Sequence, residues 1–171
     1  MALTTIKNLN LASSVTGTLP TANGGTGATS FSPGKLLQTI SDTKTNTTQS
    51  TSSTSFVASS LTIDITPSAT SSKILLFLNG GQMYTPANRA LHVTIYRDST
   101  NLGDATRGMA RMTVGGGGEL LAPHSIHFLD SPNSSSQKTY TVYFESDDGS
   151  TVYLSTGSAG TMSFTAMEIG A

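Results

Sequence analysis

Alternation of apolar and polar residues is the dominant pattern from residue 61 to residue 170. It recurs at residues 61–65, 89–98, 138–146, 150–156 and 161–170. A period of two residues is typical of strands with one buried face, and no stripe with a helical period accompanies it. In segment 89–98, Leu91 and Val93 share the apolar face, whereas His92 lies on the other face and is expected to be half exposed. Segment 73–78 (KILLFL) is apolar throughout, which predicts a central strand covered on both sides.

Segments rich in Gly, Pro, Asn, Asp and Ser separate these runs, and such residues favour turns. The segments are 66–72, 97–103, 114–119, 129–137 and 146–150. Segment 146–150 (SDDGS) joins two alternating runs and predicts a β-hairpin. Short strands at this spacing predict an all-β domain, an antiparallel β-sandwich of jelly-roll type, over residues 35–171.

Composition narrows the classes of function. The 171 residues carry a net charge of −1 with 11% charged residues, so no basic face for nucleic acid is expected. Ser and Thr make up roughly 30% of the chain, far above ordinary usage. The longest apolar run, 74–78, is too short to span a bilayer, so no membrane insertion is expected. The chain has no cysteine, which excludes disulfides and makes oligomerisation the expected source of extra stability.

Residues 1–34 differ from the rest and predict an extended N-terminal arm. Their apolar residues are too sparse to form a core within one chain. Segment 18–27 (TLPTANGGTG) combines one proline with three glycines, which allow positive φ angles and close backbone approach. Both properties suit several chains that meet at a common axis.

Segment 16–30 (TGTLPTANGGTGATS) resembles a motif of bacteriophage tail-fibre and related virion proteins, in which Leu-Pro-x-Ala-Asn-Gly-Gly-Thr-Gly precedes a distal β domain. Segments 65–80, 91–104, 127–142 and 164–171 resemble successive parts of such a domain, in the expected order. Together the matching segments span most of residues 16–171. The resemblance implies a homotrimer. Its trimer motif would comprise Leu19, Pro20, Asn23, Gly24, Gly25 and Gly27.

The resemblance also implies a structural protein of a phage virion. We expect a tail-fibre or receptor-binding protein that mediates host attachment, is made in the host cytoplasm and lies on the particle surface. Residues 1–34 would dock onto another virion protein, a tail adaptor or the capsid. The β domain would contact a polysaccharide or protein of the host cell surface. Because only residues 1–17 precede the motif, a capsid decoration or head-fibre protein is the alternative.

No enzymatic activity, cofactor or metal is expected. The carboxylates Asp104, Glu119, Asp130 and Glu145 show no spacing that suggests a glycosidase pair, and no nucleophile motif surrounds any serine. His124 and His127 would lie on opposite faces of a strand and could not bind one ion together.

Receptor contacts are expected in two long loops, 79–90 and 103–119, because binding residues concentrate on loops. The candidates are Met83, Tyr84, Arg107, Met109, Arg111 and Met112. Packing of these residues against a neighbouring subunit is the alternative. Near the C-terminus, Glu168 shares the apolar face of Phe164, so it is expected either at the rim or paired with an arginine.

Overall fold

The computed structural model describes residues 36–157 and 160–170. In these residues every regular element is a β-strand, and there is no helix. The proposed trimer motif in residues 19–27 lies outside the described residues. The prediction of an all-β, antiparallel domain is confirmed, since every pair of neighbouring strands is antiparallel. The strands are β1 (Leu36–Thr45), β2 (Thr48–Thr51), β3 (Val57–Ile65), β4 (Lys73–Asn79), β5 (Met83–Thr85), β6 (Ala90–Arg97), β7 (Thr100–Asn101), β8 (Ala110–Thr113), β9 (Leu120–Ala122), β10 (Ser125–Asp130), β11 (Lys138–Ser146), β12 (Val152–Thr156) and β13 (Thr161–Ile169).

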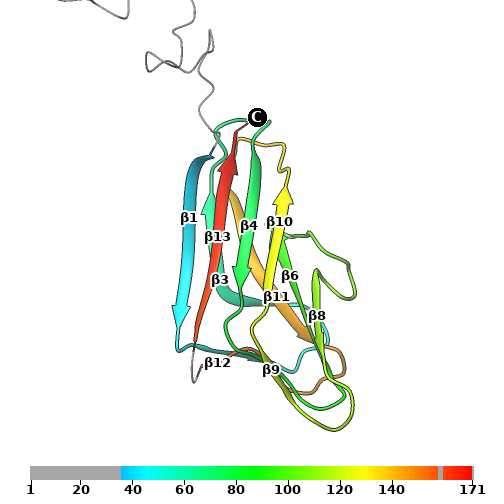
Figure 1. The fold of residues 1–171 in the computed structure, drawn as a ribbon. Helices are drawn as coiled ribbons and strands as arrows, with labels where there is room; N and C mark the ends of the chain where they lie inside the picture. Colours follow the sequence, from blue (N-terminus) through cyan, green and yellow to red (C-terminus); the bar gives the residue numbers. More distant parts are fainter. Residues whose placement is uncertain (1–35, 158–159, 171) are drawn as a thin grey trace, which may run out of the picture. The chain divides into compact units, whose positions relative to one another are not determined.

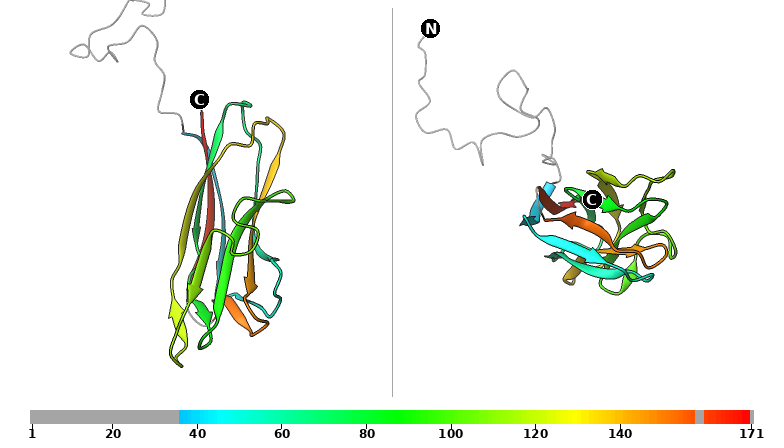
Figure 2. Two further views of the ribbon diagram at one scale, coloured as in Figure 1. Left: turned by 90° about the vertical axis from the view of Figure 1, so that its right-hand side faces the viewer. Right: turned by 90° about the horizontal axis from the view of Figure 1, so that it is seen from below.

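The strands form three sheets, of which two face each other as layers (Figures 1 and 2). Sheet I has the order β1-β13-β4-β10, and sheet II has the order β3-β11-β6-β7 with β8 beside β6. Strand β3 of sheet II lies against β1 and β13 of sheet I. Sheet III has the order β2-β12-β5-β9. Strand β1 runs from Leu36 to Thr45, and β2 of sheet III follows directly after it. Sheet III therefore lies at the end of the sandwich opposite Leu36 (Figure 1).

The core lies between sheets I and II and follows the alternation of the sequence. In β3, Leu61, Ile63 and Ile65 are at most 2% exposed, while the residues between them are exposed. A single register thus sends every second side chain inward, because successive strand residues point to opposite faces. The largest fully buried side chains include Tyr140, Phe144, Phe164, Leu76, Leu78 and Ile95.

A polar cluster joins the two layers inside this core. Arg97 of β6 donates from Nη1 to both carboxylate oxygens of Asp130 in β10, at 2.8 Å each. The hydroxyl of Tyr140 in β11 donates to Oδ2 of Asp130 at 2.6 Å. Burial and this hydrogen bond raise the pKa of Tyr140 well above its usual range. A buried carboxylate is tolerated here because charged and neutral donors both satisfy it.

Two predictions about individual segments are wrong. Strand β4 is central in sheet I, but its outer face is not covered: Phe77 is 41% exposed. Segment 146–150 does not form a hairpin, because β11 belongs to sheet II and β12 to sheet III. Asp148 Oδ1 instead accepts a hydrogen bond from the Ser150 amide at 3.0 Å, so the segment is a local turn between sheets.

Candidate functional site

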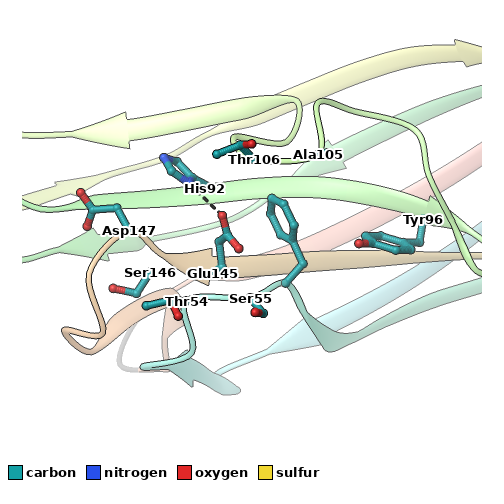
Figure 3. Close-up of a pocket in the computed structure, with 10 residues that line it drawn as sticks. Thr54, Ser55, His92, Tyr96, Ala105, Thr106, Glu145, Ser146 and Asp147 are labelled. Atoms are coloured by element: carbon teal, nitrogen blue, oxygen red, sulfur yellow. Dashed lines mark hydrogen bonds and ion pairs between the residues drawn. The ribbon is translucent and has the colours of Figure 1, made fainter.

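A pocket of about 480 Å³ opens on the outer face of sheet II (Figure 3). Strands β6 and β11 supply its floor, and two loop segments supply its walls. This volume falls in the range of small-molecule sites in proteins. The lining residues are Thr54, Ser55, Phe56, His92, Tyr96, Ala105, Thr106, Glu145, Ser146 and Asp147.

The floor holds a buried histidine–carboxylate pair. His92 and Glu145 are cross-strand neighbours in β6 and β11, and His92 Nδ1 lies 3.1 Å from Glu145 Oε1. Their side chains are 7% and 9% exposed, so the expectation of a half-exposed His92 is wrong. When Nδ1–H donates to the carboxylate, Nε2 is an acceptor in the neutral imidazole and a donor in the charged one. Among the described residues, this buried Nε2 has no hydrogen-bond partner.

One wall is the loop after β7, which packs unusually close to β6. A Cβ atom on Gly103 would lie 2.6 Å from Thr94 Oγ1, and one on Gly108 would lie 2.5 Å from the Val93 carbonyl oxygen. Both positions therefore require glycine. Asp104 Oδ1 accepts hydrogen bonds from the amides of Thr106 and Arg107 at 2.9 and 2.8 Å, which stabilises the turn. The loop thus holds Thr106 at the pocket and covers the outer face of β6.

The opposite wall comes from the segment between β2 and β3. The Ser146 amide donates to the Ser53 carbonyl at 2.8 Å, which attaches this segment to the end of β11. Phe56 packs edge-to-face against Tyr96 with ring centroids 6.5 Å apart. Tyr96 in turn stacks on Tyr143 at 4.0 Å. The aromatic side of the pocket is therefore fixed by packing, and the Tyr96 hydroxyl points toward the other lining residues (Figure 3).

The rim carries a second carboxylate. Asp147 is exposed, and its Oδ1 accepts a hydrogen bond from the Ala90 amide at 2.9 Å. With Glu145 the pocket contains two carboxylates and several hydroxyls, and no lysine or arginine among the described residues lines it. The nearby Arg89 pairs instead with Asp148 at 2.9 Å. The arrangement offers hydrogen-bond acceptors beside an aromatic surface and repels anions.

The structure does not bring the expected receptor-contact residues together. Met83 and Met112 are 0% and 7% exposed and belong to the core, which removes them from the surface candidates. They lie in strands β5 and β8, so the two expected loops are partly strands. Arg107 and Arg111 are exposed, while Tyr84 and Met109 are half-buried.

Tyr84 lies in a second hollow, of about 400 Å³, with Leu121, Tyr153 and Thr156. Its ring packs edge-to-face on Tyr153 with centroids 5.5 Å apart, and its hydroxyl donates to Glu119 at 3.1 Å. This hydrogen bond raises the pKa of Tyr84. The hollow is on sheet III, away from Arg107 and Arg111, so the expected contact residues fall into separate regions.

The remaining titratable groups make structural contacts. Asp104 caps the pocket loop, and Asp130 joins the two layers. Burial lowers the pKa of His124, and His127 is exposed on the outer face of sheet I. No group of three or more His, Asp or Glu side chains suited to a metal ion occurs within residues 36–157 and 160–170. In the same residues, no helix is long and apolar enough to cross a membrane.

Sequence reasoning missed His92, Glu145 and Asp147 as partners in one site. His92 and Glu145 are 53 residues apart, and only the pairing register of β6 with β11 places them opposite each other. The one sequence signal was a histidine and a glutamate on the polar faces of two alternating runs. That signal becomes specific only once the register is known.

No protein-family model and no curated protein matches the sequence. Among solved structures, the fold is similar to a chain in the structure of infectious bursal disease virus, Gx strain, with a TM-score of 0.36 and 15% sequence identity. The match covers 80% of this chain and 38% of that chain. A likeness of this size carries no information about function.

Proposed function

We propose that the protein is a structural component of a bacteriophage virion, a tail-fibre or receptor-binding protein that mediates host attachment. The observation that supports this most is the succession of the Leu-Pro-x-Ala-Asn-Gly-Gly-Thr-Gly segment and a β-sandwich that begins at Leu36. Residues 1–34 attach the chain to another virion protein. The sandwich, of jelly-roll type, presents its pocket and loops to the host surface.

We further propose that the working unit is a homotrimer, with the outer face of sheet I at the subunit contact. This face exposes Phe77 (41%) and Leu129 (48%), and the register places Leu75 and Met167 in the same row as Leu129. These residues form an apolar patch on a face that is otherwise rich in Thr and Ser, and the sheet gains stability when such a patch is buried. The described part of this face carries Lys73 and His127 and no carboxylate, so a second copy can cover it without burying an acid.

Mass measurement in solution tests the trimer. At micromolar concentration we expect three times the monomer mass of 17.7 kDa for the full chain. Phe77→Glu introduces a charge into the contact and should yield monomers that remain folded, because Phe77 contributes nothing to the monomer core. The matched variant Thr62→Glu, exposed on β3, should remain trimeric. A monomeric wild-type chain would refute the proposal.

Labelling of intact particles tests the location. A tag at the C-terminus should be detected at the tail. Removal of residues 1–34 should leave a folded sandwich that no longer joins particles. Assembly of the truncated chain into particles would show that the arm is not the anchor.

A capsid decoration or head-fibre protein is the second candidate. Labelling spread over the whole shell would support this candidate and exclude the first.

A further inference from the structure

We propose that the pocket formed by His92, Tyr96, Glu145 and Asp147 binds a neutral saccharide. This proposal rests on the proposed host-attachment function and names the class of ligand that would be bound. It assigns the contact to the outer face of sheet II, away from the hollow at Tyr84.

The first argument is the excess of hydrogen-bond acceptors. Glu145 uses Oε1 for His92, and Asp147 uses Oδ1 for the Ala90 amide. In the part of the chain that the structure describes, neither carboxylate has a partner on its second oxygen. Carboxylates accept strong hydrogen bonds from hydroxyl donors, and adjacent hydroxyls on a sugar ring supply several such donors at once.

The second argument is the unsatisfied imidazole nitrogen. His92 is buried, yet its Nε2 has no partner within residues 36–157 and 160–170. A buried polar atom without a hydrogen bond costs about 1–3 kcal/mol. This nitrogen is itself closed off from solvent, so a ligand hydroxyl reaches it only when the side chains around it move aside. A purely apolar ligand would leave the cost in place.

The third argument is the aromatic side of the pocket. Tyr96 is held by stacking on Tyr143 and by the edge of Phe56, so its position is set before a ligand arrives. Sugar rings have apolar C–H faces beside their hydroxyls, and such faces pack on aromatic rings. An acceptor set next to a fixed aromatic ring therefore matches both surfaces of a saccharide.

The charge of the pocket decides between neutral and acidic saccharides. Glu145 and Asp147 lie in it, and within residues 36–157 and 160–170 no lysine or arginine lines it. An anionic sugar would bring like charges together with no cation to compensate, which disfavours its binding. We therefore expect neutral hexoses or N-acetylhexosamines and exclude sugars that carry carboxylate or phosphate.

The walls are pre-organised, which lowers the entropic cost of binding. The loop at Thr106 is held by Asp104 and by the glycines that contact β6, and the Ser53 segment is attached to Ser146. A single pocket of this polarity binds weakly. Several copies on one particle multiply the binding through effective concentration.

The experiment uses the purified full chain on an array of neutral oligosaccharides and of matched chains that contain uronic or sialic acid. The best neutral binder is then titrated by calorimetry. Asp147→Asn removes one charged acceptor from the exposed rim and should weaken binding about tenfold, as expected for one hydrogen bond to a charged group. Thr106→Trp fills the pocket from its exposed wall and should abolish binding.

Asp64→Asn is the matched control, since Asp64 is an exposed aspartate of β3 outside the pocket. Its binding should equal that of the wild type, and all three variants should unfold at the wild-type temperature. The proposal is overturned if no neutral saccharide binds, if acidic chains bind better, or if Thr106→Trp still binds. Particle labelling stays separate from this result, because the chain can be a virion protein whether or not this pocket takes a sugar.

Discussion

Glu168 offers a sharp test of how this fold holds a buried charge. The residue is 0% exposed, on the inner face of β13. Its Oε1 accepts hydrogen bonds from the amide and the hydroxyl of Ser68 at 2.7 and 2.6 Å, and its Oε2 accepts one from Gln38 Nε2 at 2.6 Å. Glu168 therefore lies neither at the rim nor beside an arginine, the two places expected for it from the sequence. Neutral donors stabilise the charge, and they fix the turn between β3 and β4 to sheet I.

These contacts control the ionisation of Glu168. Burial opposes the charged form, but the hydrogen bonds from Ser68 and Gln38 outweigh it and lower the pKa from 4.5 to about 2. Because the folded chain holds this proton less tightly than the unfolded chain does, Glu168 stabilises the fold fully above about pH 4.5. That stabilisation is lost as the pH falls from 4.5 toward 2.

Glu168→Gln removes the charge and keeps the shape. The glutamine oxygen can accept from Ser68, but its amide group then faces the amide group of Gln38. Gln38 cannot turn its oxygen inward without losing its hydrogen bond to the Thr66 carbonyl, at 2.8 Å. We expect the free energy of unfolding at pH 7 to fall by about 1.5–3 kcal/mol, the range for hydrogen bonds to a charged group.

Urea unfolding at pH 7 and at pH 3, at fixed protein concentration, measures this effect. The wild type should lose stability between the two pH values, and the difference between wild type and Glu168→Gln should shrink at pH 3. Glu119→Gln is the control, because Glu119 is an exposed carboxylate that also accepts one hydrogen bond. It should change stability by less than about 0.5 kcal/mol. Equal stability of Glu168→Gln and wild type at pH 7 would refute the reasoning.

Two further predictions concern the core and the pocket wall. Tyr140→Phe removes the hydroxyl that donates to Asp130 at 2.6 Å. In urea titrations this change should lower the free energy of unfolding by about 1–2 kcal/mol. An unchanged unfolding midpoint would show that the hydroxyl does not stabilise the contact between the two layers. Gly108→Ala places a Cβ 2.5 Å from the Val93 carbonyl at a φ of +67°, whereas Gly117→Ala, at +82°, meets open space. Hydrogen exchange should therefore accelerate across the pocket loop for the first variant only, and equal exchange in both variants would contradict the close packing.

Alternation alone was sufficient to predict the inner face of the sandwich. Ile63 and Phe144 lie in alternating runs and are 2% exposed, as their patterns predict. The physical reason is local: a strand turns successive side chains to opposite faces, so one buried face leaves a period of two in the sequence. The same reasoning fails for β4, where an apolar run predicts burial on both sides but Phe77 stays 41% exposed in the single chain. Periodicity records which residues are apolar and says nothing about what covers them.

The candidate site could not be predicted from the sequence, for a related reason. The outer faces of β6 and β11 look polar and solvent-facing in the sequence, yet His92 and Glu145 are buried there. The loop with Gly103 and Gly108 folds back over β6, and such a covering depends on the path of the chain after β7.

The sequence by itself determined the inward-facing apolar residues of the long alternating runs, because strand alternation depends on neighbours within a few positions. It also predicted the all-β class, but not the short strands β5 and β8 inside segments expected as loops. The tertiary structure alone decided that β11 and β12 enter different sheets, that Met83 and Met112 are core residues, and that Ser68 and Gln38 hold Glu168. Each of these depends on contacts between residues far apart along the chain. Strand register and sheet order determine such contacts, and neither can be predicted from the local periodicity of the sequence.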